Sequence, residues 1–315
     1  MAETDGITRR INTAEDLRSI VRTMKALAAA NIRQYEDAAA SLVDYAAAVA
    51  LGFQALFKIR PDRLPQQATK AAPQRIGAIV LGSDHGLCGA FNERVTDFYL
   101  ERRWASAQGG PVIALGGRVA DRLDDRGVLP DEVIAQPASA GRIGVLVREL
   151  LERVAGWRDA GTADAVRVYF NAARGRASYQ PREELLLPLD EDSLRRQAAA
   201  PWRPRAWPTI AGDWDALFAA VVEQHLFVTL HRAIAQSLAG ENASRLTAMH
   251  AAERNIDDRL HALRGQFHRE RQTAITTELL DIVSGYEALT SGGPRKERAR
   301  DARLRPERAP AARPR

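Results

Sequence analysis

The stretch GSDHGLCGAFN, at residues 82–92, has the look of a phosphate-binding turn and directly follows the apolar run RIGAIVL. A phosphate loop needs Gly-x-x-x-x-Gly-Lys-Ser/Thr, because backbone amides surround the phosphates while the lysine neutralises their charge. Here Gly86 and Gly89 are followed by Ala90 and Phe91, and no lysine is present. The dinucleotide pattern Gly-x-Gly-x-x-Gly and the nucleophile pattern Gly-x-Ser-x-Gly are also missing. We therefore predict a strand-to-helix turn whose glycines permit tight backbone geometry.

The histidines, the acidic residues and the cysteine do not form a catalytic or metal-binding pattern either. Cys88 is the only cysteine, which excludes an internal disulfide and a four-thiolate zinc site, so we expect a small buried residue. The acids Asp190, Glu191 and Asp192 follow a predicted strand and are typical of a solvated turn. Five of the six histidines lie on the helix predicted at 211–290, none three or four residues from another, at His225, His231, His250, His261 and His268. The sequence predicts no catalytic residue, no cofactor site and no metal site.

The elements that hold these residues begin with a long helix. From Asn12 to about Phe57 the apolar residues follow helical spacing, and Thr13 with Asp16 resembles an N-terminal capping box. One lattice repeats every seven positions, at Val21, Ala28, Tyr35, Leu42, Val49 and Leu56. Its companion lattice is Leu17, Met24, Asn31, Ala38, Tyr45 and Gly52, in which the members at 31, 38 and 52 are small or polar. A helix of this length needs a partner helix, and the small members would let one approach closely.

The candidate partner is a second long helix, from Asp213 to Leu289, because no proline occurs between Gly212 and Gly293. Gly240 and Gly265 lie inside it and could mark bends. Its apolar residues also recur every seven positions, on lattices that drift along the helix: Met249, Ile256 and Leu263; Leu260, Phe267 and Ala274; Ile275, Ile282 and Leu289. The chain is therefore expected to begin and end in long helices.

Between the two helices the composition is that of an α/β fold. A proline-punctuated linker, 61–74, precedes short apolar runs that predict strands, at Ile76–Leu81, Val112–Leu115, Val166–Phe170 and Leu185–Leu187. Helical segments alternate with them, near Asn92–Trp104, Arg118–Arg126 and Arg142–Trp157. This alternation favours a mostly parallel sheet with helices on both faces. We divide the chain into a helix at 1–60, the linker, an α/β domain at 75–210, a helix at 211–290 and a tail at 291–315.

The net charge of +5 is concentrated in the tail. From Ser291 onward there are nine Lys or Arg and three acids, so the tail is +6 and the other 290 residues sum to −1. Such a Pro-, Arg- and Ala-rich end is typical of disorder. The body has no basic excess, and we expect no nucleic-acid partner. The longest apolar runs, such as 45–53, are shorter than a membrane span, so no direct span is expected.

Three blocks of sequence carry a family resemblance. They are IVRTMKALAAANIRQ at 20–34, GSDHGLCGAFN at 82–92, and the pair ENASRLTAMHAAERN at 241–255 with RQTAITTELLDIVSG at 271–285. The chain resembles the gamma-subunit family of the rotary F-type ATP synthases, over residues of about 7 to 289. His85 and Ala90 stand where the family pattern has arginine and glycine, and the basic tail runs past the usual family end. These departures suggest a divergent bacterial form.

The resemblance implies a fold and a mode of action. The terminal helices would form a long antiparallel coiled coil, with an inserted Rossmann-like α/β foot domain. This shaft would stand inside three alpha and three beta subunits, and its rotation would couple transmembrane ion flow to ATP synthesis or hydrolysis at their catalytic sites. The foot would hold an epsilon-type subunit and the membrane rotor ring. The protein would lie peripherally at the cytoplasmic face of the bacterial inner membrane, as a non-catalytic subunit of the enzyme.

The resemblance also implies contact residues on the shaft. Met24 and Lys25 would meet the mobile lever of a beta subunit, although an ordinary coil residue beside a solvated lysine fits them as well. Arg271, Gln272, Thr276 and Glu278 would bind the collar of a beta subunit, with Arg245 as a partner across the shaft; the alternative is an exposed helix face.

Two other classes of function stay open from the sequence. A non-enzymatic coiled-coil scaffold, or a nucleic-acid-binding protein, would use the long helices and the basic tail. A nucleotide-dependent enzyme would need the phosphate loop that 82–92 lacks. Neither the coupled ion, proton or sodium, nor the direction of catalysis follows from this chain.

Overall fold

The computed structural model describes residues 2–64, 75–105, 109–174, 178–202 and 206–291. Most of the predicted linker and nearly all of the basic tail lie outside these ranges. The helices are α1 (Ala2–Ala40), α2 (Val43–Ile59), α3 (Phe91–Ala105), α4 (Gly117–Asp125), α5 (Ile143–Asp159), α6 (Glu191–Ala199) and α7 (Trp214–Ser291), with short 3-10 turns at Pro61–Arg63 and Ala140–Arg142. The strands are β1 (Ile76–Leu81), β2 (Gly109–Leu115), β3 (Glu132–Ile134), β4 (Ala165–Arg174) and β5 (Ser178–Leu187).

The N-terminal helix begins earlier than predicted and is interrupted once. Helix α1 starts at Ala2, so the capping box predicted at Thr13 is wrong. The Thr13 hydroxyl instead donates to the Arg9 carbonyl oxygen one turn back, at 2.9 Å, as threonines inside helices do. A turn at Ser41 and Leu42 then separates α1 from α2.

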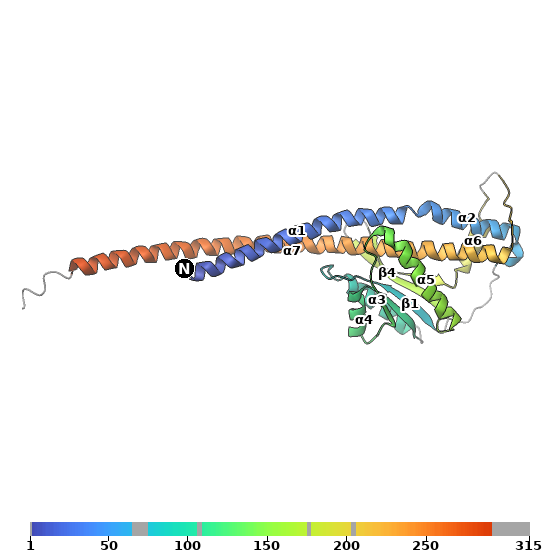
Figure 1. The fold of residues 1–315 in the computed structure, drawn as a ribbon, viewed down its shortest axis with the longest axis horizontal. Helices are drawn as coiled ribbons and strands as arrows, with labels where there is room; N and C mark the ends of the chain where they lie inside the picture. The colour runs from blue at the N-terminus through green and yellow to red at the C-terminus, as the bar shows by residue number, and fades with distance from the viewer. Residues whose placement is uncertain (1, 65–74, 106–108, 175–177, 203–205, 292–315) are drawn as a thin grey trace, which may run out of the picture. The chain divides into compact units, whose positions relative to one another are not determined.

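Helix α7 continues without interruption for 78 residues, and Gly240 and Gly265 both lie within it. Between residues 20 and 253, α1 and α2 pack against α7 in antiparallel order, because Lys25 meets Glu253 whereas Tyr45 meets Gln224. Figure 1 shows α2 beside the first part of α7. The contact surface follows the first predicted lattice, since its members Ala28, Tyr35, Val49 and Leu56 are all buried.

Chain contacts divide the protein into two compact units, residues 20–253 and residues 1–19 with 254–315. The second unit also contains an antiparallel helix pair. Glu15 accepts from Arg264 at 2.6 Å, and Arg18 pairs with Asp257 at 2.8 Å. Ile7 is buried in this unit with 4% of its surface exposed. Each unit thus has its own contacts between the two ends of the chain.

The inserted domain is a five-stranded sheet in the order β3-β2-β1-β4-β5, with the last pair antiparallel and the others parallel. Helices α3 and α4 cover one face, where Val95 and Val119 pack on Ala78 and Val80 of β1. The other face packs on α5 and on α7. The mostly parallel sheet with two covered faces is therefore confirmed, and α7 itself supplies part of the cover.

Two short elements were not predicted. Strand β3 has only three residues, too few for a period-2 pattern, and it pairs in parallel with β2 as the edge strand of the sheet. Helix α6 replaces the solvated turn that we predicted at Asp190–Asp192. Asp190 is the N-cap, and its side chain accepts from the backbone N–H of Asp192 at 3.1 Å. Carboxylates in the first turn of a helix also offset the positive end of its dipole, which explains the acidic cluster.

One apolar stretch meets the length and hydropathy of a membrane crossing, against our expectation. It is an 18-residue window in the helical segment Thr4–Ile59, with a mean hydropathy of 1.5. Phe53 and Phe57, near the end of that segment, are buried beside Leu194 of α6 and Val228 of α7. The apolar composition of this segment is therefore also explained by its packing against α6 and α7.

Candidate partner-binding surfaces

The glycine turn joins β1 to α3 through a network of its own polar groups. Ser83 is fully buried; its backbone N–H donates to Asn92 Oδ1 at 2.9 Å, and Asn92 Nδ2 donates to Ser83 Oγ at 2.8 Å. Two residues have left-handed backbone, Gly89 at φ 58° and, unexpectedly, Leu87 at φ 63°. A side chain on Gly82 would collide with Val119, since its Cβ would lie 2.2 Å from the valine Cβ. The strand-to-helix turn is confirmed.

Cys88 lies within this turn. Its side chain is buried, with 2% exposed, as we expected. Burial raises the pKa of the Cys88 thiol, while the nearby Ser83 hydroxyl, which lies 3.5 Å from Sγ, acts in the opposite direction. A thiol held in its neutral form is a poor nucleophile and a poor metal ligand.

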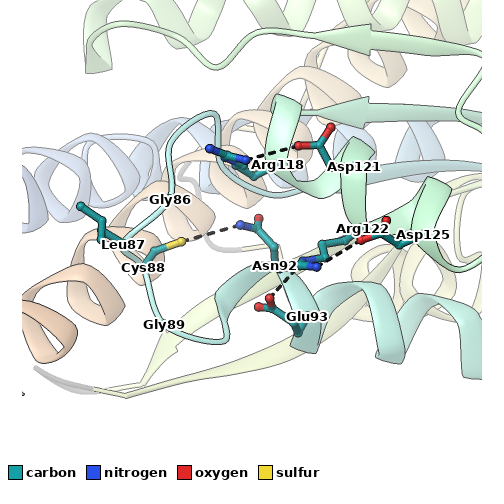
Figure 2. A pocket seen from close by; sticks show the side chains of 10 residues that line it. All are labelled: Gly86, Leu87, Cys88, Gly89, Asn92, Glu93, Arg118, Asp121, Arg122 and Asp125. Atoms are coloured by element: carbon teal, nitrogen blue, oxygen red, sulfur yellow. Dashed lines mark hydrogen bonds and ion pairs between the residues drawn. The ribbon is translucent and has the colours of Figure 1, made fainter.

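A cavity of about 380 Å³ lies between the turn and α4 (Figure 2). Its two arginines are already paired: Arg118 with Asp121 at 3.6 Å, and Arg122 with Glu93 at 3.0 Å and with Asp125 at 3.1 Å. Three acids therefore face two arginines. Such a lining does not favour a phosphate group, which needs uncompensated positive charge or free amides.

In the described part of the chain, no group of three or more His, Cys, Asp or Glu side chains is arranged to hold a metal ion. His225 instead packs edge-on against Phe53, with ring centroids 5.7 Å apart. Burial lowers its pKa, and the charge of Arg232 lowers it further, so the ring is neutral.

Met24 and Lys25 occupy different environments on α1. Met24 is half-buried and is flanked along the helix by Ile20 and Leu27, whose exposed fractions are 54% and 59%. Lys25 is engaged within the chain, since its Nζ donates to Glu253 Oε2 at 2.5 Å. Residues spaced four and then three apart share one helix face, so Ile20, Met24 and Leu27 form an apolar surface that the described chain leaves uncovered.

Arg245 lies far from the other predicted collar residues in sequence and belongs to the unit of residues 20–253. Its guanidinium pairs with Glu241, one turn before it on α7, at 2.7 Å. The same Nη2 reaches the carbonyl oxygen of His85 in the glycine turn at 3.5 Å. Its position therefore links the shaft to the turn.

Arg271, Gln272, Thr276 and Glu278 are all exposed on α7. The Thr276 hydroxyl donates to the Gln272 carbonyl oxygen of the same helix at 2.9 Å. Within the described chain, the side chains of Arg271, Gln272 and Glu278 make no hydrogen bond or ion pair. Their polar groups are thus available to another molecule.

An apolar seam accompanies these four residues and was assigned wrongly from the sequence. We expected Ile275, Ile282 and Leu289 to pack on the N-terminal helix, but their exposed fractions are 50%, 64% and 83%. With two neighbours they make a four-three spacing, which we call the exposed seam: Ile275, Leu279, Ile282, Tyr286 and Leu289. The buried seam before it, through Leu260 and Leu263, would continue to Ala274 and Asp281 on a different face.

The length of α1 explains part of this exposure. Helix α1 begins at Ala2, thirteen residues before Glu15, and an equal step along α7 from Arg264 ends at Thr277. The exposed seam from Leu279 onward therefore extends past the first residue of α1. The periodicity of α7 alone could not show this exposure, because an apolar period indicates a face that needs a partner but not which segment or molecule covers it.

Comparison with known proteins decides the family. The profile of the ATP synthase family matches residues 3–289 of this chain. The chain belongs to the ATP synthase gamma-chain family. The gamma chain of Bdellovibrio bacteriovorus is 26% identical over 294 residues, covering 92% of this chain and 99% of the relative. That of Syntrophus aciditrophicus is 28% identical over 296 residues, covering 93% and 100%.

Chains of solved ATP synthase structures have the same fold as this chain. A chain in the mitochondrial ATP synthase of Euglena gracilis, from its OSCP, F1 and c-ring assembly, aligns with a TM-score of 0.62 at 18% identity, covering 94% of this chain and 98% of that one. A chain of the central stalk and c-ring of the Tetrahymena thermophila enzyme gives 0.52 at 18% identity, covering 74% and 99%. The family match ends at the last residue of the exposed seam, so the seam lies within the region that the family shares.

Proposed function

We propose that this chain is the central rotor shaft of an F-type ATP synthase and couples transmembrane ion flow to ATP synthesis or hydrolysis by rotating inside the alpha and beta subunits. The observation that carries the proposal is the family match over residues 3–289, on a chain whose two ends form paired helices. The glycine turn performs no chemistry in this proposal. It belongs to the scaffold.

The exposed seam and its polar flank would be the contact with the collar of the hexamer. Exposing an apolar stripe of five residues to water is unfavourable, and covering it would stabilise the contact by ~25 cal/mol per Å² of apolar surface buried. Arg271, Gln272, Thr276 and Glu278 would add polar contacts beside that stripe. A helix with an apolar stripe and few polar contacts suits a rotating interface, because apolar contacts are non-directional and allow one surface to turn against another.

The second contact would lie at Met24. The uncovered face formed by Ile20, Met24 and Leu27 would receive the mobile lever of a beta subunit. Lys25 would contribute the methylene groups of its side chain to this contact, while its ammonium group stays paired with Glu253. Arg245, whose guanidinium reaches the glycine turn, would be a partner-binding residue across the shaft from the collar contacts.

The sheet domain would be the foot of the rotor. We propose that it binds an epsilon-type subunit and the membrane rotor ring, which places the protein peripherally at the cytoplasmic face of a bacterial cell membrane. The membership of bacterial relatives in the same family supports this location.

The test is co-expression of this chain with the alpha and beta subunits of its own organism. We expect one stable complex whose ATP hydrolysis depends on the chain, and rotation of a bead attached to the foot when ATP is added. The isolated chain should bind no ATP at micromolar concentrations. If the chain does not enter the complex but binds DNA in a salt-dependent manner, the rotor function is wrong and the protein is a scaffold or a nucleic-acid-binding protein.

A further inference from the structure

The turn between β1 and α3 faces one side of α7 and meets it through backbone carbonyl groups. Ser244 Oγ donates to the Cys88 carbonyl oxygen at 2.5 Å, and Arg245 Nη2 reaches the His85 carbonyl oxygen at 3.5 Å. With Glu241, these residues are spaced three and four apart, so they share one face of the helix. The shaft therefore contacts the turn mainly through the turn's main chain.

Gln136, which follows β3, connects this face to the sheet. Its Nε2 donates to Glu241 Oε2 at 2.6 Å and to the Gly82 carbonyl oxygen at 2.6 Å. Its Oε1 accepts from the Asp84 backbone N–H at 3.2 Å. One amide thus contacts the end of β1, the glycine turn and α7, and both of its polar ends are used.

Asp84 completes the network on the sheet side. One carboxylate oxygen accepts from the Gln136 backbone N–H at 2.8 Å, and the other accepts from the backbone N–H of Gly117, the first residue of α4, at 3.0 Å. The loops after β1, β2 and β3 are therefore joined to one another before Gln136 joins them to the shaft. Movement of one loop would carry the others.

Glu241 is the shaft's end of the network and is nearly buried, with 4% of its surface exposed. Burial raises its pKa, while Arg245 and Gln136 favour the charged form. Tyr35 of α1 is buried in the same region, and burial together with the charge of Glu241 raises its pKa. A buried carboxylate holds its position only while its partners are present, because an unpaired buried charge is strongly disfavoured.

We propose that Gln136 is a positioning residue for rotary coupling: it locks the loops at the carboxyl ends of β1, β2 and β3 onto α7 through Glu241, so that foot and shaft turn as one body. The inference rests on the proposed rotor function, in which torque enters through the foot and leaves along the shaft. Hydrogen-bonded groups with a defined geometry resist sliding in a way that apolar contacts alone do not. The network lies where that resistance is needed.

The junction itself is tested by hydrogen exchange on the full chain. Gln136→Leu removes the amide and leaves the Glu241 carboxylate and the Gly82 carbonyl group without this partner. We expect exchange of the Asp84 and Gly117 amides to accelerate by about tenfold, the factor for a lost buried hydrogen bond of ~1.4 kcal/mol. Gln197→Leu in α6, whose Nε2 donates to Ser193 Oγ of the same helix at 3.5 Å, is the matched control and should leave these amides unchanged. Unchanged exchange in Gln136→Leu would refute the lock.

Its use in coupling is tested in the complete enzyme in vesicles, by ion uptake per ATP hydrolysed. Gln136→Leu and Gln136→Glu should lower this ratio while assembly and ATP hydrolysis persist, and Gln136→Glu should be the worse because two carboxylates would meet. Adding Glu241→Gln to Gln136→Glu exchanges donor and acceptor and should restore part of the ratio, which a general loss of stability would not do. A normal ratio in both single variants would overturn the positioning role. A wild-type chain that supports neither assembly nor hydrolysis would instead refute the rotor function, and the exchange result would still decide the lock.

Discussion

Glu253 shows how single residues fix the helix pair within the unit of residues 20–253. Its carboxylate accepts from Lys25 Nζ at 2.5 Å and from Arg22 Nε at 2.9 Å, both across from α1. These two bonds, with Lys25 the stronger cause, lower the pKa of Glu253 to about 2. A carboxylate whose folded pKa is lowered stabilises the fold above its ordinary pKa, and that contribution is lost as the pH falls toward the folded value.

We predict that Glu253→Gln lowers the melting temperature of the chain at pH 7 and that the difference from the wild type shrinks as the pH falls from about 4.5 to about 2. Thermal melts followed by circular dichroism at several pH values measure both quantities. Glu36→Gln, at an exposed position of the same helix pair, is the control and should give little change at any pH. A difference that persists undiminished at pH 2 would mean that the ion pairs do not hold this carboxylate.

At the scale of the element, α2 depends on its buried lattice for its place beside α7. Val49 has 8% of its surface exposed and packs with Phe53 and Val228. Leu42, the preceding lattice member, lies at the turn between α1 and α2 and is only half-buried. We therefore expect the lattice residues within α2 to contribute more to the stability of this helix pair than Leu42 does.

Val49→Asp should destabilise the chain by roughly 3–5 kcal/mol, the usual range for a buried charge without a partner. The free energy of unfolding in urea measures this. Ala47→Asp introduces the same charge at an exposed position two residues away and should change stability by less than about 0.5 kcal/mol. Equal losses in the two variants would show that α2 does not pack through Val49.

The C-terminal part of α7 has the opposite design, because its apolar seam faces outward. Arg271→Ala with Gln272→Ala should lower ATP synthesis in vesicles while the isolated chain melts as the wild type does, since exposed helix positions tolerate alanine. Asp258→Ala with Arg259→Ala, two exposed neighbours earlier in α7, is the control and should keep synthesis. Wild-type synthesis in the first double variant would remove these residues from the working contact.

At the scale of the whole molecule, the basic end of the chain separates from the part that the family shares. The family match ends at residue 289, and residues 292–315 lie outside the described ranges. Their charge makes them the only basic excess in a chain that is otherwise slightly acidic. The rotor function places no demand on them.

Deleting residues 292–315 should therefore leave assembly and ATP synthesis largely unchanged, while any salt-dependent retention on DNA should fall. Synthesis in membrane vesicles and binding to a DNA column measure the two effects. If the deletion abolished synthesis and the Arg271 and Gln272 double variant behaved as the wild type, the working contacts would lie at the other end of this segment.

Local patterns in the sequence were enough to determine several elements of this protein. Four of the six members of the seven-residue lattice in the first helix are buried, and strand β1 has the predicted bounds. The turn at 82–92 is a strand-to-helix connection, as its missing lysine indicated. Periodicity and glycine placement are local properties of a backbone, so a single sequence records them directly.

Only the tertiary structure decided what these elements do to one another. The hydrogen bond between Gln136 and Glu241 joins residues 105 positions apart, and no spacing rule connects them. The exposed seam of α7 has the same four-three pattern as a buried one, and its exposure depends on where α1 begins. An apolar period states that a face must be covered, whereas the identity of the cover is set by the three-dimensional arrangement, because burial is a relation between distant segments and not a property of either one.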